Sequence, residues 1–429
     1  MTGGIGINEG TVVRTILGNG IVLLLYPNPT SPSVAIAAEH AAGAILESEG
    51  QCGLAGLTAG ALNRGTTTRS FMRFSAELDD VGASLSFGSG IESGSFSGRA
   101  LAEDLEVLLR LAADGLRNPI FPAKEVAQLR DQALTGIAHV EDNPSALADR
   151  RFRELMFGRD NPYGRPDDGY ADTVGALTAE LVRDFHASVF DPGSLTVAVV
   201  GAIDPDEARD RCAEYFEGWS VPTSRVVKRR DDAIRTFDRA VVGPGVTREE
   251  LALPGKTQTE LTLGWAGVRR LDPEYYPVVI GNYILGQLGL GGRIGASVRD
   301  EQGLAYHATS HAESGRARMP WTIRAGVNPE NVQRAVDSGL DEASRLADEP
   351  PSDEELSLTK QAMIGSLPLR LERNAGIADV LLSIEAYGLG LDYLECYPRL
   401  VEAVTGDDVR SAAARFIGRD AYTLVTAGP

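Results

Sequence analysis

The sequence predicts an α+β protein made of two similar halves, because one pattern of helix and strand occurs twice. Residues 178–201 (TAELVRDFHASVFDPGSLTVAVVG) and 405–428 (TGDDVRSAAARFIGRDAYTLVTAG) share Thr, Arg, Thr and Gly at the same relative positions. In both, a threonine suited to cap a helix precedes an acidic first turn. A run rich in Val, Leu and Thr then ends in glycine. Each segment is therefore expected to form a helix followed by a strand.

A second pair of segments supports the duplication. Leucine and alanine recur at helical spacing over residues 101–116, and two prolines then precede a helix that begins near Lys124. Residues 332–346 show a similar stripe, followed by two prolines and a capped helix start at 352–355. Two repeats in the same order predict two homologous α/β-sandwich domains, each with helices packed on a sheet rich in antiparallel strands.

The connection between the halves has a different composition. Residues 221–249 contain the basic run Lys228-Arg229-Arg230, mixed charges and the turn residues Gly243-Pro244-Gly245. We interpret this stretch as a solvated linker rather than a docking site, since short charge runs usually face water. The predicted domains are therefore residues 1–220 and 250–429.

Composition narrows the class of protein. A formal net charge of −19 argues against a nucleic-acid partner or an anionic membrane. The three cysteines, Cys52, Cys212 and Cys396, are too far apart for a metal knuckle and odd in number, which indicates a reducing compartment. The N-terminus lacks the basic start and apolar stretch of a signal peptide, so we expect a cytoplasmic protein unless an export signal has been removed.

The segment Gly289–Tyr306 (GLGGRIGASVRDEQGLAY) carries the strongest chemical signal. Val298 and its neighbours predict a short helix that ends near Glu301 with Arg299 in its last turn, and Gly303 suits a left-handed cap. Tyr306 would begin the next strand. An arginine in a last turn and a tyrosine in a strand are each more often structural. Together they suit the binding of a peptide carbonyl and of the oxyanion formed on cleavage.

Several motifs in order resemble the pitrilysin/insulinase family of zinc metallopeptidases (inverzincins), in particular its short processing-peptidase-like branch. These motifs are QCGLAGLTAGALNRGTTTRS at residues 51–70, Pro162-Tyr163-Gly164-Arg165, Pro192-x-x-Leu195, Leu285-Gly286 and Gly303-Leu304-Ala305-Tyr306. The resemblance covers almost the whole chain and implies a clamshell arrangement of the two domains.

The zinc-binding positions of that family carry no ligand here. The inverted motif His-x-x-Glu-His places two histidines on one helix face with a glutamate as general base. The resemblance puts the histidine positions at Gly56 and Gly60, and the glutamate position at Ala59. The third ligand falls near Gly136, before Glu141-Asp142-Asn143-Pro144. We therefore expect no metal in this chain, and zinc in a catalytic partner.

The histidines give no alternative metal site. The sequence contains five of them: His40, His139, His186, His307 and His311. His307 and His311 would share a face, but a strand would hold them far apart and no third ligand accompanies them. A packed or solvent-facing role is the better interpretation for all five.

The second half keeps its part of the family pattern. The resemblance implies that Arg299 holds a substrate carbonyl and that the Tyr306 hydroxyl donates to the tetrahedral oxyanion. It also implies that the glycine-rich loop with Gly289, Gly291 and Gly292 touches substrate. A flexible turn is an equally good interpretation of this loop, which lacks the pattern of a phosphate loop.

Three functions remain to be compared. The first is a zinc-less subunit, inactive alone, that supplies Arg299 and Tyr306 in trans to a homologous catalytic subunit with the His-x-x-Glu-His motif. The chain could also form a homodimer when that partner is absent. The second is a peptidase-like structural or peptide-binding protein with no catalytic role. The third, a self-sufficient metallopeptidase with unusual ligands, is the weakest. The first two predict peptide as the ligand.

Overall fold

The computed structural model describes residues 6–220, 225–239 and 245–429. Residue contacts group the chain into two compact units. The first comprises Met1–Ile137, Pro166–Ile234 and Leu367–Cys396, and the second comprises Ala138–Arg165, Arg235–Ser366 and Tyr397–Pro429. Each unit holds one sheet and one hydrophobic core. The predicted combination of two α/β parts is therefore confirmed.

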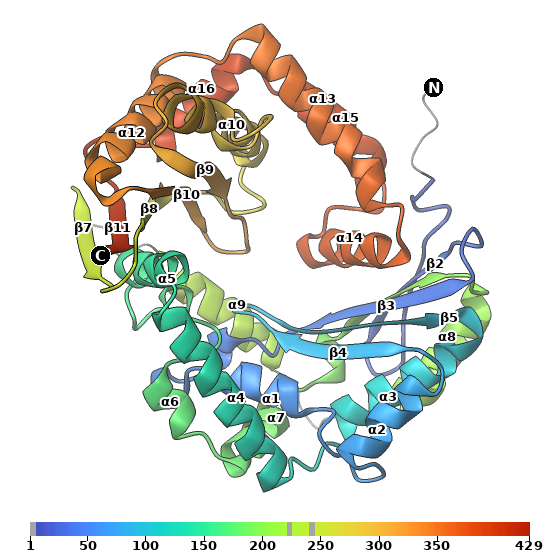
Figure 1. Cartoon of the computed structure of the whole chain (residues 1–429). Coiled ribbons are helices and arrows are strands. Elements are labelled where there is room, and N and C mark those ends of the chain that lie inside the picture. Colours follow the sequence, from blue (N-terminus) through green and yellow to red (C-terminus); the bar gives the residue numbers. More distant parts are fainter. Residues whose placement is uncertain (1–5, 221–224, 240–244) are drawn as a thin grey trace. The chain divides into compact units, whose positions relative to one another are not determined.

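The first unit is built on a six-stranded mixed sheet in the order β1-β2-β6-β3-β5-β4. β2 and β6 are parallel, and the other neighbours are antiparallel. The strands are β1 (Val13–Ile16), β2 (Val22–Pro27), β3 (Ser33–His40), β4 (Ser84–Ser89), β5 (Gly94–Leu101) and β6 (Thr196–Gly201). The helices are α1 (Leu54–Ala61), α2 (Phe71–Asp79), α3 (Leu105–Arg117), α6 (Ala171–Gly175), α7 (Ala179–Val189), α8 (Pro205–Phe216) and α14 (Asn374–Tyr387). Figure 1 shows α14 on one face of this sheet and α3 on the other.

The second unit is built on a five-stranded sheet in the order β7-β11-β8-β10-β9. β7 and β11 are parallel, and the others are antiparallel. The strands are β7 (Thr247–Ala252), β8 (Thr259–Ala266), β9 (Ala305–Ala312), β10 (Pro320–Val327) and β11 (Thr423–Gly428). The helices are α5 (Pro144–Phe157), α10 (Tyr275–Gly286), α11 (Gly292–Ile294), the π-helical η6 (Gly295–Glu301), α12 (Val332–Asp348) and α16 (Gly406–Phe416). Four further helices run from one unit into the other: α4 (Ala123–Glu141), α9 (Val226–Phe237), α13 (Asp353–Arg370) and α15 (Tyr393–Glu402).

The structure shows the duplication that the sequence predicts. Thr178 caps α7 by accepting from the Leu181 amide at 3.3 Å, and Thr405 caps α16 by accepting from the Asp408 amide at 3.1 Å. The strands that follow these helices, β6 and β11, occupy the same place in their sheets. Each lies between one parallel neighbour and one antiparallel neighbour. The repeated segments therefore form equivalent helix–strand pairs.

Each sheet is covered by a helix from the other half of the sequence. α5 packs on β8 and β11, whereas α14 packs on β3 and β6, which are the equivalent strands (Figure 1). The compact units thus exchange one helix each, and they differ from contiguous domains at residues 1–220 and 250–429. Long-range packing of an apolar helix face produces this exchange, and local sequence patterns do not report it.

The predicted linker at residues 221–249 contains a regular helix. α9 spans Val226–Phe237, and its Val226, Arg230 and Ile234 are buried. Arg230 pairs with Asp231 at 3.0 Å, so the basic run is partly packed rather than fully solvated. The buried positions i, i+4 and i+8 lie among charged residues, so composition alone does not report the helix, and the linker role of residues 221–249 stays a prediction. The first two residues of the Gly243-Pro244-Gly245 turn lie outside the described residues.

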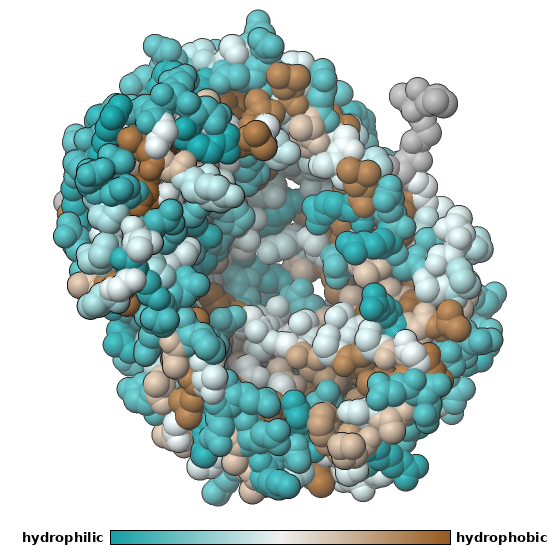
Figure 2. All heavy atoms as spheres, in the orientation of Figure 1, coloured by the Kyte–Doolittle hydropathy of each residue, from teal (hydrophilic) through white to brown (hydrophobic). Residues whose placement is uncertain are grey.

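Hydrophilic side chains dominate the surface on the face that Figure 2 shows, with hydrophobic side chains in scattered patches. This distribution agrees with the formal net charge of −19. Among the described residues, none of the helices is both long and apolar enough to cross a membrane.

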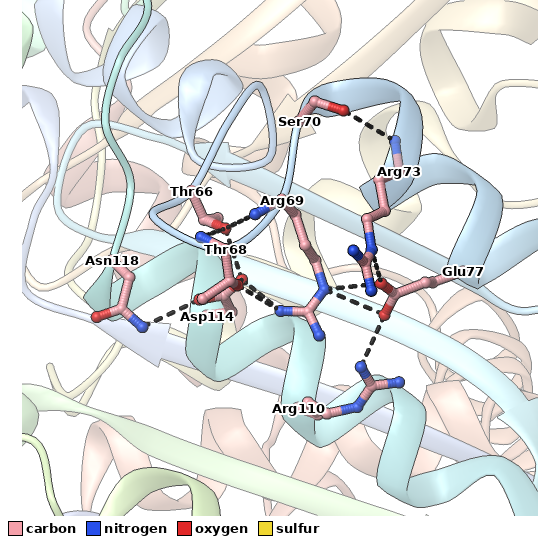
Figure 3. Close-up of polar contacts among 9 residues, drawn as sticks. All are labelled: Thr66, Thr68, Arg69, Ser70, Arg73, Glu77, Arg110, Asp114 and Asn118. Atoms are coloured by element: carbon pink, nitrogen blue, oxygen red, sulfur yellow. Dashed lines mark hydrogen bonds and ion pairs between the residues drawn. The ribbon is translucent and has the colours of Figure 1, made fainter.

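A buried polar network fixes the turn that follows α1 (Figure 3). The Asp114 carboxylate accepts hydrogen bonds from Thr66 at 2.7 Å, Thr68 at 3.1 Å, Arg69 at 2.7 Å and Asn118 at 3.0 Å. Burial alone would raise the pKa of Asp114, but these donors outweigh it and lower the pKa. The carboxylate therefore stays ionised and ties the Gly-Thr turn to α3.

Glu77 is a second centre in the same network. Its carboxylate accepts from Arg69 at 3.0 Å, Arg73 at 3.1 Å and Arg110 at 2.7 Å (Figure 3). Arg69 thus bridges Asp114 and Glu77 and joins the turn to both α2 and α3.

Two histidines in the first unit stack around one phenylalanine. The rings of His40 and His186 lie 4.7 Å and 4.4 Å from the ring of Phe190. Burial lowers the pKa of His40 to about 3, with a further contribution from His186. Burial also lowers the pKa of His186 to about 4, against a hydrogen bond to the Leu116 carbonyl oxygen. Both rings are neutral in the folded protein near pH 7.

The two neutral histidines should make the protein less stable in acid. Unfolded histidine takes up a proton near pH 6.5, whereas the folded rings do so only near pH 3 and pH 4. The two histidines therefore leave the free energy of unfolding undiminished above about pH 7.5, and they lower it as the pH drops below about 6.5. At pH 5 each histidine should lower the free energy of unfolding by about 2 kcal/mol relative to its value at pH 8.

Urea unfolding at pH 8 and pH 5 measures this loss. His186→Asn should remove about half of the pH dependence, whereas a matched change of the exposed His139 to Gln should leave it unaltered. An equal loss between pH 8 and pH 5 in the wild type and in His186→Asn would contradict the assignment.

Candidate functional site

Arg299 lies on the π-helical segment η6, in place of the α-helix that the sequence predicts. Buried Val298 anchors the segment, and the Leu304 amide donates to the Val298 carbonyl at 2.9 Å. Gly303 has a φ of 63°, which confirms the predicted left-handed break. Short π-helical stretches occur frequently at functional sites. This one ends the helix and leads directly into β9.

The Arg299 guanidinium is held by its neighbour Asp300. Nε lies 2.8 Å from Asp300 Oδ1, and Nη2 lies 3.1 Å from Oδ2. This hydrogen-bonded pair raises the pKa of Arg299. Nη1 makes no hydrogen bond to the described residues and remains available to a ligand. Asp300 is not among the site residues predicted from the sequence, although an acidic residue directly after Arg299 was a visible signal.

Tyr306 is presented by a β-bulge in strand β9. His307 pairs with Gly326 of β10, and Ala305 pairs with Val327, so Tyr306 has no opposite residue. Strand alternation would place Tyr306 on the buried face with Ala308. The extra residue shifts it to the exposed face, where 87% of it is accessible. Bulges often aim a side chain in this way beside active sites.

The bulge places Tyr306 beside a polar row on the same face of the sheet. His307, Thr309 and His311 are exposed there, whereas Ala308 and Ser310 are buried. His307 reaches across Gly326 to Glu260 at 3.3 Å, and this hydrogen bond raises the pKa of His307. Since β9 is the edge strand of its sheet, its outer backbone groups face away from the ladder. The His307–Glu260 pair could not be predicted from the sequence, because no local pattern joins these residues.

The glycine-rich loop before α11 has a strict backbone requirement. Gly289, Gly291 and Gly292 all have positive φ, at 63°, 121° and 58°. A Cβ at Gly291 would lie 2.8 Å from the Ala308 oxygen, and one at Gly292 would lie 2.4 Å from the Ile284 oxygen. Contacts within the fold therefore account for glycine at 291 and 292, whereas Gly289 has open space around it. Substrate contact by this loop remains a prediction.

The predicted zinc positions lie in the first unit. Gly56, Ala59 and Gly60 are on α1, and Gly136 is on α4. The Glu47 carboxylate caps the start of α1 by accepting from the Ala55 amide at 2.5 Å. Cβ atoms at Gly56 and Gly60 would meet their nearest neighbours at 3.6 Å and 3.9 Å, which is ordinary contact. Side chains could be added at these two positions without a clash at Cβ.

The contacts of α1 indicate how α4 passes it. Leu129 of α4 is the neighbour of Gly60, and Pro122, just before α4, is the neighbour of Gly65. The later residue of the α1 segment, Gly65, meets the earlier residue of the α4 segment, Pro122. α1 and α4 therefore run antiparallel. Gly136 lies two helical turns after Leu129, so it shares that face and is level with the start of α1. A Cβ at Gly136 would have no neighbour within 4 Å, so this position has open space around it.

Comparison with known proteins assigns the family. Residues 22–166 match the sequence model described as Insulinase (Peptidase family M16), and residues 176–363 match the one described as Peptidase M16 inactive domain. The chain belongs to peptidase family M16, the pitrilysin/insulinase family. The resemblance found in the motifs is therefore confirmed.

Relatives and structures agree with this M16 assignment over nearly the full chain. An uncharacterized zinc protease of Streptomyces coelicolor is 28% identical over 411 residues, which are 96% of this chain and 88% of the relative. The crystal structure of a peptidase M16 inactive domain from Pseudomonas fluorescens is 26% identical, with a TM-score of 0.87 and 98% of each chain covered. A Helicobacter pylori protease has the same fold at 17% identity, with a TM-score of 0.86 over 98% of this chain and 100% of the other.

The residues of this M16 chain do not fit the zinc that the family implies. Glycine and alanine at 56, 59, 60 and 136 offer no donor atom to a metal. Among the described residues, no group of three or more His, Cys, Asp or Glu side chains is arranged to hold a metal ion.

Restoring three ligands should restore zinc binding. The variant Gly56→His/Gly60→His/Gly136→Glu places two imidazoles four residues apart on α1 and adds a carboxylate on α4. It leaves buried Ala59 unchanged. We expect one zinc per chain by metal analysis, bound at least roughly tenfold more tightly than by the variant that lacks the Gly136→Glu change. Equal zinc affinity of the two variants would show that a carboxylate at position 136 does not reach a metal held on α1.

Proposed function

We propose that this chain is the zinc-less subunit of a heterodimeric zinc metallopeptidase. In this assembly a homologous subunit with an intact His-x-x-Glu-His motif carries the zinc, and this chain supplies Arg299 and Tyr306. The observation that carries the proposal is an asymmetry. All four zinc positions lack donor atoms in their side chains, whereas Arg299, with 25% of its side chain exposed, and the exposed Tyr306 lie on consecutive elements.

The two side chains suit complementary tasks. Arg299 has Nε and Nη2 bound to Asp300, so its remaining Nη1 can donate to a peptide carbonyl without the guanidinium losing its orientation. The Tyr306 hydroxyl projects from the bulge and can donate to the oxyanion that forms as the carbonyl is attacked. Neither task requires a metal ligand or a general base in this chain.

The edge strand β9 supplies a place for the peptide backbone. Its outer N–H and C=O groups have no ladder partner, because β9 is last in the order β7-β11-β8-β10-β9. An extended peptide can add to such an edge through main-chain hydrogen bonds, which carry little sequence preference. Tyr306, which lies at the start of β9, would then be close to the peptide backbone.

A mixing experiment tests the proposal. The pure chain should contain no stoichiometric zinc and should not cleave a fluorogenic peptide. Adding the homologous His-x-x-Glu-His subunit from the same organism should produce cleavage, and Arg299→Ala should reduce it without reducing complex formation on gel filtration. The exposed His311→Gln, on the same sheet face, is the matched control. A complex whose cleavage rate is indifferent to Arg299→Ala would favour a purely structural subunit.

A further inference from the structure

A pocket of about 400 Å³ lies in the second unit, lined in part by Gly292 and by the η6 segment that also carries Arg299. Its walls come from the end of α10, the α11–η6 segment, α12 and the start of α13. Ile284, Leu288 and Ala296 give it an apolar part, and the remaining lining is strongly charged. Pockets of this size with a few polar groups are typical of small-molecule sites.

Arg293 is a buried cation in this pocket with unused hydrogen-bonding capacity. Only 9% of its side chain is exposed. Nε and Nη2 donate to the two oxygens of Glu355 at 2.7 Å and 2.8 Å. Nη1 is buried and has no hydrogen-bond partner among the described residues. A buried donor without an acceptor is rare in folded proteins, and a bound ligand is one way to supply the acceptor.

The acidic side of the pocket is also incompletely paired. Glu342 Oε2 is buried and lies 2.9 Å from Arg345 Nη2, in an ion pair that lacks hydrogen-bond geometry. Burial raises the pKa of Glu342 against the attraction of Arg345, and nearby Glu301 raises it further. Ser352 and Arg293 bind Glu355, and Arg345 pairs with Glu342, so the exposed Glu301 is the carboxylate most open to a further cation.

The balance of charges selects the ligand class. Two guanidiniums, of Arg293 and Arg345, face three carboxylates, of Glu301, Glu342 and Glu355. The excess negative charge disfavours phosphate and other simple anions. A bare metal ion would leave Arg293 Nη1 without an acceptor. A molecule with one carboxylate and more than one cationic group matches both sides.

We propose that this pocket binds a small zwitterion of net positive charge, namely a basic α-amino acid or a short peptide of that kind. Its carboxylate accepts from Arg293 Nη1, and its cationic groups lie against Glu342 and Glu301. The apolar wall at Ile284 and Leu288 contacts the aliphatic stem. This inference does not depend on the function proposed above.

Calorimetric titration of the full chain with three probes tests the proposal. L-arginine should bind saturably. Agmatine, which lacks the carboxylate, and L-glutamate, which lacks the second cation, should each bind at least tenfold more weakly. No saturable binding of L-arginine, or equal binding of L-glutamate, would overturn the proposal.

Variants locate the site. Glu301 is exposed, so Glu301→Gln should fold normally and weaken L-arginine binding roughly tenfold. Glu103→Gln, which changes a carboxylate lining a different pocket in the first unit, is the matched control and should have no effect. L-arginine should also slow amide hydrogen exchange in Gly292–Glu301, which forms one wall of the pocket. Unchanged binding in Glu301→Gln, together with unchanged exchange, would place any arginine binding elsewhere and overturn the assignment.

Discussion

Replacing Tyr306 with phenylalanine should lower kcat of the mixed assembly by roughly 10²- to 10³-fold, the cost of removing one oxyanion donor. The substitution removes only the hydroxyl. The ring would keep its place on the bulge, where 87% of the residue is exposed and little packing depends on it. The loss should therefore appear in kcat, with KM and assembly largely unchanged, because the hydrogen bond strengthens only as negative charge develops.

Single-turnover cleavage of a fluorogenic peptide by the mixed assembly measures this effect. Tyr283→Phe, which removes a phenol from α10 in the same unit, is the matched control and should leave kcat unaltered. Gel filtration of the Tyr306→Phe complex distinguishes lost chemistry from lost assembly. If the variant complex forms and cleaves at the wild-type rate, Tyr306 gives no transition-state contact and the chain is a structural subunit.

The sequence predicted those parts of the fold whose cause is local. The caps at Thr178 and Thr405 were predictable because each threonine oxygen binds an amide only three residues further along the chain. Gly303 adopts positive φ for the same kind of reason. The internal repeat then located two equivalent strands, β6 and β11, without any knowledge of their neighbours.

The parts that could not be predicted depend on partners distant in sequence. The exchange of α5 and α14 between the units is decided by which apolar sheet face each helix meets. The helix α9 was not predicted within the linker, because its three buried residues are separated by charged ones. Arg293 of α11 is buried and pairs with Glu355 of α13, and no local motif connects these two segments.

The candidate site shows the same division. A strand beginning near Tyr306 was predictable from its sequence, but ordinary alternation would have buried its side chain with Ala308. The bulge opposite Gly326 and Val327 leaves Tyr306 exposed instead. The bulge depends on the register between β9 and β10. Arg299 and Tyr306 were therefore identified by motif, whereas the exposure of Tyr306 follows from a backbone irregularity, the bulge in β9.

Replacing Asp114 with alanine should destabilise the first unit by about 3–5 kcal/mol, because it removes one partner of a buried ion pair. The Asp114 side chain is 7% exposed and Arg69 is 12% exposed, so water cannot easily take over the lost contacts. Thr66 and Thr68 would also lose their common acceptor (Figure 3). Since domains are typically stable by only about 5–15 kcal/mol, the loss would be a large part of the total.

Amide hydrogen exchange of α3 measures this change within the first unit alone, since Asp114 lies on that helix. Asp114→Asn keeps one acceptor oxygen and should cost less than alanine, because Thr66 can still donate to it. Asp142→Ala is the surface control. Its carboxylate is 80% exposed and pairs with Lys256 at 3.0 Å, an interaction worth no more than about 1 kcal/mol. If protection of α3 falls no further in Asp114→Ala than in Asp142→Ala, the network does not hold the turn after α1, and its geometry must be maintained by the apolar contacts of Leu62 and Phe74 instead.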